Sequence, residues 1–127
     1  MTVTTREQPV KRSEAPTRGP AWANDATLVE IVGRIVASGN PQKIVLFGSR
    51  ARGDAGVDSD YDLLVVEPSD LPRHKRAVPY RRALAGLAGA KDILVWTPEE
   101  IAQWSAVPNA FITTAVQEGV VLYERPM

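Results

Sequence analysis

Residues 46–66 read LFGSRARGDAGVDSDYDLLVV, and this stretch decides the fold. KIVLF, residues 43–47, is a short apolar run bounded by chain breakers, which predicts a buried β-strand. YDLLVVE, residues 61–67, predicts a second buried strand. The segment between them is rich in Gly and Asp, which indicates a loop with room for one helical turn. Two buried strands joined by a polar loop therefore form the centre of the predicted domain.

The sequence on either side predicts the remaining elements. Before the first strand, Asn24 or Asp25 can cap a helix with apolar residues at helical spacing, which ends at Gly39. Residues 72–89 are expected to be helical, and Pro79 leaves open whether that helix starts at Pro72 with a kink or starts near Pro79. DILVW, residues 92–96, predicts a third strand.

The C-terminal third predicts two helices and a strand. Thr97-Pro98-Glu99-Glu100 is the pattern of a helix start, because Thr97 can cap, Pro98 suits the first turn and Glu100 completes a capping box. A short helix over about 109–118 and a strand VVLY from residue 120 follow. We therefore expect a small α/β (α+β) domain with a central mixed sheet of about four strands flanked by helices. Trp22, Trp96 and Trp104 are expected to be packing residues.

Length and composition limit the possible functions. The chain has 127 residues, which suits one domain, and we expect residues 1–21 to be a disordered leader and residues 22–127 to fold. There is no cysteine, so disulfides and thiolate metal sites are excluded. Fifteen basic residues balance fifteen acidic ones, and no stretch has the pattern of a secretory signal or a membrane span. We expect a cytoplasmic protein without membrane contact or direct nucleic-acid binding.

The loop after the first strand has the residues of a phosphate-binding turn. Gly48 lacks a Cβ, so backbone amides can approach a triphosphate closely. The Ser49 hydroxyl can donate to phosphate oxygens, helped if residues 49–53 form a helical turn. Arg50 and Arg52 could each bind phosphate or brace the loop by pairing with an acid. Asp54 and Asp58 in the same loop are expected to be turn formers.

Three aspartates have the pattern of a metal site. Asp60 and Asp62 are two positions apart at the start of a strand, so their side chains leave on the same face. Two carboxylates that close repel each other unless a cation lies between them, and Mg²⁺ is a hard ion that binds carboxylates together with phosphate oxygens. Asp92 opens the next apolar strand, and if that strand lies beside 61–66 it completes a three-carboxylate cluster. Two ions about 4 Å apart can then clamp the oxygens of a phosphoryl transfer.

These residues resemble a known family. The string G-S-x10-D-x-D, with an apolar strand on each side and a later strand-borne Asp, is similar to the DNA polymerase β-like nucleotidyltransferases. GSRARGDAGVDSDYDLLVV resembles the minimal, single-domain branch (MNT proteins). The resemblance implies that Gly48 and Ser49 hold the triphosphate of ATP and that Asp60, Asp62 and Asp92 hold two Mg²⁺ ions.

The resemblance also implies a partner. Minimal nucleotidyltransferases are typically encoded beside a small helical HEPN protein, often an RNase toxin, and act as its antitoxin by transferring AMP to a tyrosine hydroxyl. We therefore expect a hetero-oligomer with a HEPN-type toxin, in which Asp92 assists the tyrosine oxygen. Two alternatives stay open: a binding module that neutralises its partner by contact alone, and a small-molecule (aminoglycoside-type) nucleotidyltransferase.

RHKR, residues 73–76, forms a local basic cluster with Arg81 and Arg82. A solvated face is the simpler interpretation of this cluster, and binding to an acidic protein surface or to nucleic acid is the alternative. His74 is the chain's one histidine and lies inside this run, so we expect no catalytic role for it.

Overall fold

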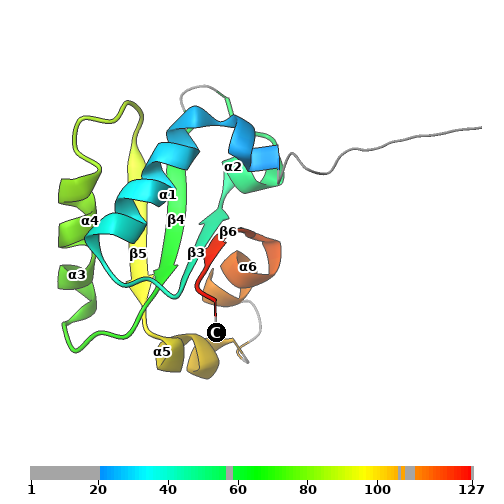
Figure 1. The fold of residues 1–127 in the computed structure, drawn as a ribbon. Helices are drawn as coiled ribbons and strands as arrows, with labels where there is room; N and C mark the ends of the chain where they lie inside the picture. Colours follow the sequence, from blue (N-terminus) through cyan, green and yellow to red (C-terminus); the bar gives the residue numbers. More distant parts are fainter. Residues whose placement is uncertain (1–20, 57–58, 106, 108–110, 127) are drawn as a thin grey trace, which may run out of the picture.

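The computed structural model describes residues 21–56, 59–105, 107 and 111–126. Residues 1–20 of the expected leader and Asp58 lie outside the described residues. The elements follow one another as η2 (Ala21–Asn24), α1 (Ala26–Ser38), β3 (Lys43–Phe47), α2 (Ser49–Arg52), β4 (Tyr61–Val66), α3 (Arg73–Arg76), α4 (Val78–Ala83), β5 (Lys91–Trp96), α5 (Pro98–Trp104), α6 (Phe111–Glu118) and β6 (Val120–Glu124) (Figure 1).

A mixed sheet in the order β5-β4-β3-β6 forms the centre of the described fold. β3 is antiparallel to both β4 and β6, whereas β4 and β5 run parallel. The expected four strands, their mixed arrangement and the flanking helices are therefore confirmed. Because β4 and β5 run parallel, both strands start at the same end of the sheet.

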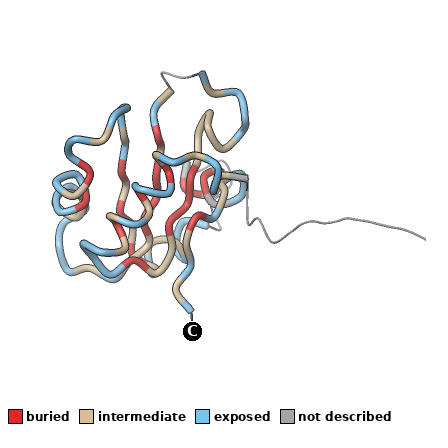
Figure 2. Tube along the Cα trace, turned by 45° about the horizontal axis from the view of Figure 1, so that its top comes forward, coloured by how far each residue is buried: buried red, intermediate tan, exposed pale blue. Residues whose placement is uncertain are grey.

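Alternating residues of the strands pack against helices on the two faces of the sheet. On one face, buried strand residues such as Ile44, Leu63 and Ile93 join one cluster with α1 and with Tyr80 of α4. On the other face, Val45 and Leu64 pack with Ile112 of α6. Figure 2 shows the buried segments concentrated along the central strands and the helix faces turned toward them. Asp62 shares the face of Leu64, because side chains two positions apart point the same way.

Helix α1 begins as the sequence indicates. Asp25 is its N-cap, and its Oδ1 accepts hydrogen bonds from the backbone N–H groups of Thr27 at 3.0 Å and Leu28 at 3.1 Å. These bonds satisfy two of the amides that have no partner within the helix. Asp25 Oδ2 also accepts from the Tyr61 hydroxyl at 3.3 Å, so the cap is tied to the first residue of β4.

The helical stretch expected over residues 72–89 starts after Pro72 and is interrupted near Pro79, which is one of the two arrangements that the sequence left open, but its extension to residue 89 is wrong. The chain forms two short helices, α3 and α4, which meet at Ala77, and the helical stretch ends at Ala83. Pro79 explains the break, because a proline inside a helix lacks an N–H and clashes with the preceding turn, whereas in the first turn of a new helix it costs little. Gly86 and Gly89 both have a φ of +90°, so the segment after α4 turns back toward β5.

Trp104 also differs from the expectation, since 43% of its surface is exposed at the end of α5. Trp22 and Trp96 are partly buried against the two clusters, as expected of packing residues. No helix within the part of the chain that the structure describes is long and apolar enough to cross a membrane.

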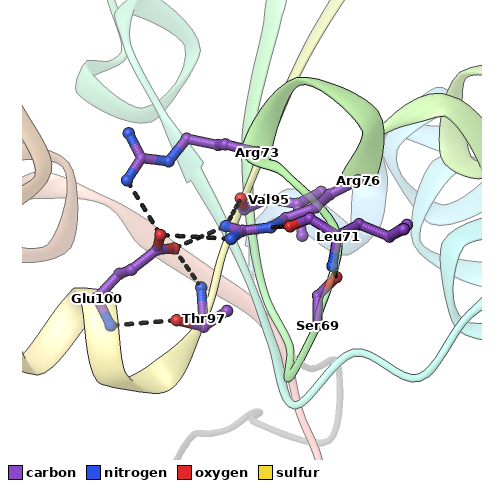
Figure 3. Close-up of polar contacts among 7 residues, drawn as sticks. All are labelled: Ser69, Leu71, Arg73, Arg76, Val95, Thr97 and Glu100. Atoms are coloured by element: carbon purple, nitrogen blue, oxygen red, sulfur yellow. Dashed lines mark hydrogen bonds and ion pairs between the residues drawn. The ribbon is translucent and has the colours of Figure 1, made fainter.

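The end of β5 is fixed by an ion-pair network, drawn in Figure 3. The capping box at Thr97 and Glu100 is confirmed, with each side chain bonded to the other's backbone N–H. Glu100 also accepts from Arg76 Nη1 at 2.7 Å and from Arg73 Nη2 at 3.1 Å. Arg76 in turn donates to the Val95 carbonyl oxygen at 3.2 Å and to that of Leu71 at 2.9 Å. Glu100 and Arg76 together therefore join α3, β5 and α5.

Candidate functional site

The sheet register brings the predicted acids together. Asp62 and Asp92 are register partners on the parallel strands β4 and β5, so the strand adjacency that the sequence left conditional is present. Asp60 lies one residue before β4. Phe47, the last residue of β3, is the register partner of Asp62 on its other side, so Gly48 leaves the sheet next to Asp62. The three acids and the Gly-Ser turn therefore meet at one end of the sheet.

The charges at this end are not balanced. Burial raises the pKa of Asp62, and the carboxylates of Asp92 and Asp60 raise that pKa further, while Arg52 lowers it. Asp60 and Asp92 are exposed, and Asp62 is half-buried. A half-buried carboxylate beside two others is costly in its charged form, and a cation relieves this cost.

The donor set fits a hard divalent cation, because it consists of carboxylate oxygens beside an open turn for a phosphate group. As the side chains lie, no three Asp, Glu, His or Cys side chains among the described residues come close enough to hold a metal ion between them. Binding of one ion by all three aspartates would therefore require a rearrangement of their side chains.

Gly48 is the residue that allows the turn to lie against the acids. Its φ of 76° and ψ of −158° belong to a region of backbone conformation that is essentially restricted to glycine. A Cβ at this position would also collide with Asp62 Oδ2. The chain then enters α2 at Ser49, so the expected helical turn is present at this point. Gly48 and Ser49 are both partly exposed at this turn.

Arg52 is the last residue of α2. Its charge acts on Asp62, and its side chain lines a hollow beside Gly48. Arg52 Nε is 3.3 Å from Asp54 Oδ2, and both side chains are more than half exposed. An exposed pair of this kind holds its partners weakly. Arg52 can therefore release Asp54 for a phosphate group at little cost.

Arg50 has a different position. Its guanidinium stacks over the Tyr61 ring at 3.9 Å, and its Nε donates to the Ser59 carbonyl oxygen at 3.0 Å. Tyr61 belongs to the cluster on the α1 face of the sheet, whereas Asp62 points to the other face. Of the two roles that the sequence left open for Arg50, phosphate binding and bracing of the loop, these contacts favour bracing. Arg50 holds the chain on both sides of Asp60, and its assignment to the nucleotide stays a prediction.

A hollow of about 270 Å³ adjoins the Gly-Ser turn and was not predicted from the sequence. It is lined by Phe47, Gly48 and Arg52 and, from α6, by Thr114, Ala115 and Glu118. No local pattern marks the α6 residues, because they reach the site only through the packing of α6 against β3. Thr114 and Glu118 thus add a hydroxyl and a carboxylate to the surroundings of the site.

Comparisons with known proteins show the family of the chain and its fold. The sequence model of the family described as "Nucleotidyltransferase domain" matches residues 26–119, while no curated protein matches the chain. A putative nucleotidyltransferase from Sulfolobus solfataricus has a similar fold, with a TM-score of 0.55 and 24% identity over 87% of this chain and 94% of that one.

Two solved toxin–antitoxin structures are similar as well. One, crystallised with AMP-PNP, has a TM-score of 0.55 and 19% identity over 76% of this chain and 73% of that one. The other, a mutant of the toxin–antitoxin MntA-HpeT, has the same score and identity over 77% of this chain and 72% of its own. At this identity the likeness concerns the fold. The family match spans α1 to the end of α6, including both acid-bearing strands and the Gly-Ser turn, and the chain belongs to the nucleotidyltransferase domain family.

Proposed function

We propose that the chain is a Mg²⁺-dependent protein adenylyltransferase that transfers AMP from ATP to a tyrosine hydroxyl of a HEPN-type toxin and thereby acts as its antitoxin. The observation that carries the proposal is the meeting of Asp60, Asp62 and Asp92 with the Gly48 turn at one end of the sheet. The similar toxin–antitoxin structure crystallised with AMP-PNP supports both the donor and the kind of partner.

In this proposal each residue has a distinct task. The turn at Gly48 and Ser49, together with Arg52, binds the triphosphate and orients its α-phosphorus. Asp60 and Asp62, with Asp92, would hold Mg²⁺, which when bound supplies neutralising charge for the triphosphate and the departing pyrophosphate. The Asp92 carboxylate accepts the proton of the attacking hydroxyl. The new bond joins the acceptor oxygen to the α-phosphorus, the bond to the β-phosphate oxygen breaks, and pyrophosphate leaves.

The experiment is a label-transfer assay with Mg²⁺ and α-labelled ATP, with and without the purified product of the neighbouring gene. Mass spectrometry is then used to locate AMP on the acceptor. The wild-type protein should label a tyrosine of that product, and Asp60→Asn should abolish labelling. Asp70→Asn removes an exposed acid in the loop after β4 and should leave labelling intact.

Two other results would point elsewhere. Tight binding of the two chains without any label would favour neutralisation by contact alone. Labelling that survives substitution of both Asp60 and Asp62 by Asn would refute the assignment of the metal ligands.

A further inference from the structure

The residues of α3 and α4 concentrate positive charge on a chain that is neutral overall. Residues 73–82 contain five Lys and Arg residues and one His, and no acid. Arg73 and Arg76 are held by Glu100 in the network at the end of β5. The remaining members, His74, Lys75, Arg81 and Arg82, are exposed. We refer to these four residues as the α3–α4 basic surface.

The α3–α4 basic surface has no internal function that the structure shows. Within the described part of the chain, none of its four side chains makes a hydrogen bond or an ion pair. By contrast, Lys91 nearby donates to three carbonyl oxygens, those of Leu87, Ala88 and Gly89, at 2.7, 3.2 and 2.5 Å. Three bonds use all the protons of an ammonium group. The donors of Arg81 and Arg82 are thus available to a partner, while those of Lys91 are not.

The α4 part of this surface lies near the acid end of the sheet, whereas α3 lies beside the other end of β5, at Val95. Arg81 and Lys91 line one hollow of about 240 Å³, together with residues of the segment between α4 and β5. Asp92 is the next residue after Lys91 and lies in register with Asp62. α3 and α4 lie beside β5, at the edge of the sheet away from β6 (Figure 1). Arg81 therefore lies near the start of the edge strand β5, on the face of the sheet opposite to that of Asp92, and a protein that reaches round this edge would contact both residues.

The surroundings favour an acidic protein surface over nucleic acid as the occupant. Surfaces that bind single strands combine cations with exposed aromatic rings on which bases stack. The aromatic residue of α3 and α4 is Tyr80, which is 1% exposed. The aspartates at the start of β4 and β5 would also repel a phosphate backbone. An acidic protein surface meets neither obstacle. Its carboxylates can pair with the guanidinium groups of α4 while the acceptor hydroxyl of the same protein faces Asp92.

We propose that the α3–α4 basic surface docks an acidic region of the protein that carries the acceptor hydroxyl, and so orients that hydroxyl toward Asp92. This inference rests on the proposed function for the identity of the acceptor. Complementary charge at the rim of an interface acts mainly on the rate of association and on its dependence on salt.

The test measures the association rate constant between the full chain and the purified product of the neighbouring gene at several salt concentrations. Arg81→Glu/Arg82→Glu should lower the rate constant at low salt about tenfold or more and flatten its salt dependence. Arg82→Glu alone should give part of the effect. The matched control is Lys43→Glu, which makes the same change of charge at the start of β3, the opposite end of the strand from Gly48. Melting curves verify that each variant is folded.

Three outcomes would overturn the inference. The double variant could associate as fast as the wild type, or Lys43→Glu could slow association as much as Arg82→Glu. Alternatively, the wild-type chain could retard a single-stranded RNA oligonucleotide while the double variant does not, which would make the surface a nucleic-acid site. Asp60→Asn separates the two proposals, because it should associate at the wild-type rate. A charge-dependent rate without AMP transfer by the wild type would leave the docking surface standing and refute the proposed function.

Discussion

Asp62 and Asp92 lie directly beside each other on the parallel strands β4 and β5, which places two like charges next to each other at one end of the sheet. Burial and the carboxylates of Asp92 and Asp60 raise the pKa of Asp62. A pair of this kind opposes folding unless a ligand compensates for it. In the proposed metal site, Mg²⁺ would supply this compensation.

Asp92→Asn should consequently stabilise the metal-free protein. Like charges facing each other across neighbouring strands cost about 0.2–1 kcal/mol, and the substitution should raise the free energy of unfolding in EDTA by this amount. Saturating Mg²⁺ should stabilise the wild type more than the variant, because the variant has lost a ligand. Denaturant unfolding with and without Mg²⁺ measures both effects, and Asp70→Asn is the control. Equal loss of stability in both conditions would show that Asp92 is held by other contacts.

Gly48→Ala should abolish AMP transfer. The new Cβ would collide with Asp62 Oδ2, and the backbone conformation at this position is one that alanine avoids, at a cost of about 1–3 kcal/mol. Gly53→Ala is the matched comparison, since Gly53 also has a positive φ, of 85°, but a Cβ there meets no atom within 4 Å. It should lose about 1–2 kcal/mol of stability from strain and keep its transfer activity. Loss of transfer in both variants would indicate that strain in α2, and not the contact with Asp62, is responsible.

The sequence predicts the strands and the acid positions because each of them is a local pattern. Apolar runs between chain breakers mark β3, β4 and β5. Gly48-Ser49 marks the end of β3, and Asp60 and Asp62 mark the start of β4. The capping box at Thr97 is equally local. These features can be recognised in the sequence without knowing which elements pack against each other.

Long-range packing decided the features that the sequence left open or missed. Arg50 and Arg52 have the same side chain, two positions apart, and only the fold shows that Arg50 stacks on Tyr61 while Arg52 acts on Asp62. Thr114 and Glu118 come to the site through α6, about 65 residues after the Gly-Ser turn. The end of α4 at Ala83 depends on the turn toward β5, which the helical spacing of residues 72–89 concealed.

The two arginines of α2 should give different phenotypes. Arg50→Gln removes the contacts with Tyr61 and Ser59 and should lower the free energy of unfolding by about 1–2 kcal/mol. It should also raise the Mg²⁺ concentration needed for half-maximal transfer, because Asp60 loses its support. Arg52→Gln should change stability by less than about 0.5 kcal/mol and raise KM for ATP.

Unfolding curves and transfer rates at varied Mg²⁺ and ATP separate the two roles, and Arg50→Lys indicates whether a charge alone suffices. A rise in KM for ATP in Arg50→Gln, with an unchanged Mg²⁺ requirement, would assign Arg50 to the nucleotide.

Glu100→Gln should destabilise the protein at neutral pH, by about 1–3 kcal/mol, because Arg76 would lose its charged partner while 9% of its side chain is exposed. Hydrogen bonding to Arg76, above all, lowers the pKa of Glu100 from 4.5 to about 2. A carboxyl whose pKa is lower in the folded state contributes its stability above its unfolded pKa. This contribution should therefore be complete above a pH of about 4.5 and be lost as the pH falls toward 2.

Denaturant unfolding of the wild type, Glu100→Gln and the control Glu99→Gln between neutral pH and pH 2 tests this pH dependence. The difference between wild type and Glu100→Gln should shrink over that acid range, whereas the exposed Glu99 should give little difference at any pH. A difference that stays constant down to pH 2 would mean that Glu100 stabilises the fold by packing and not by its charge.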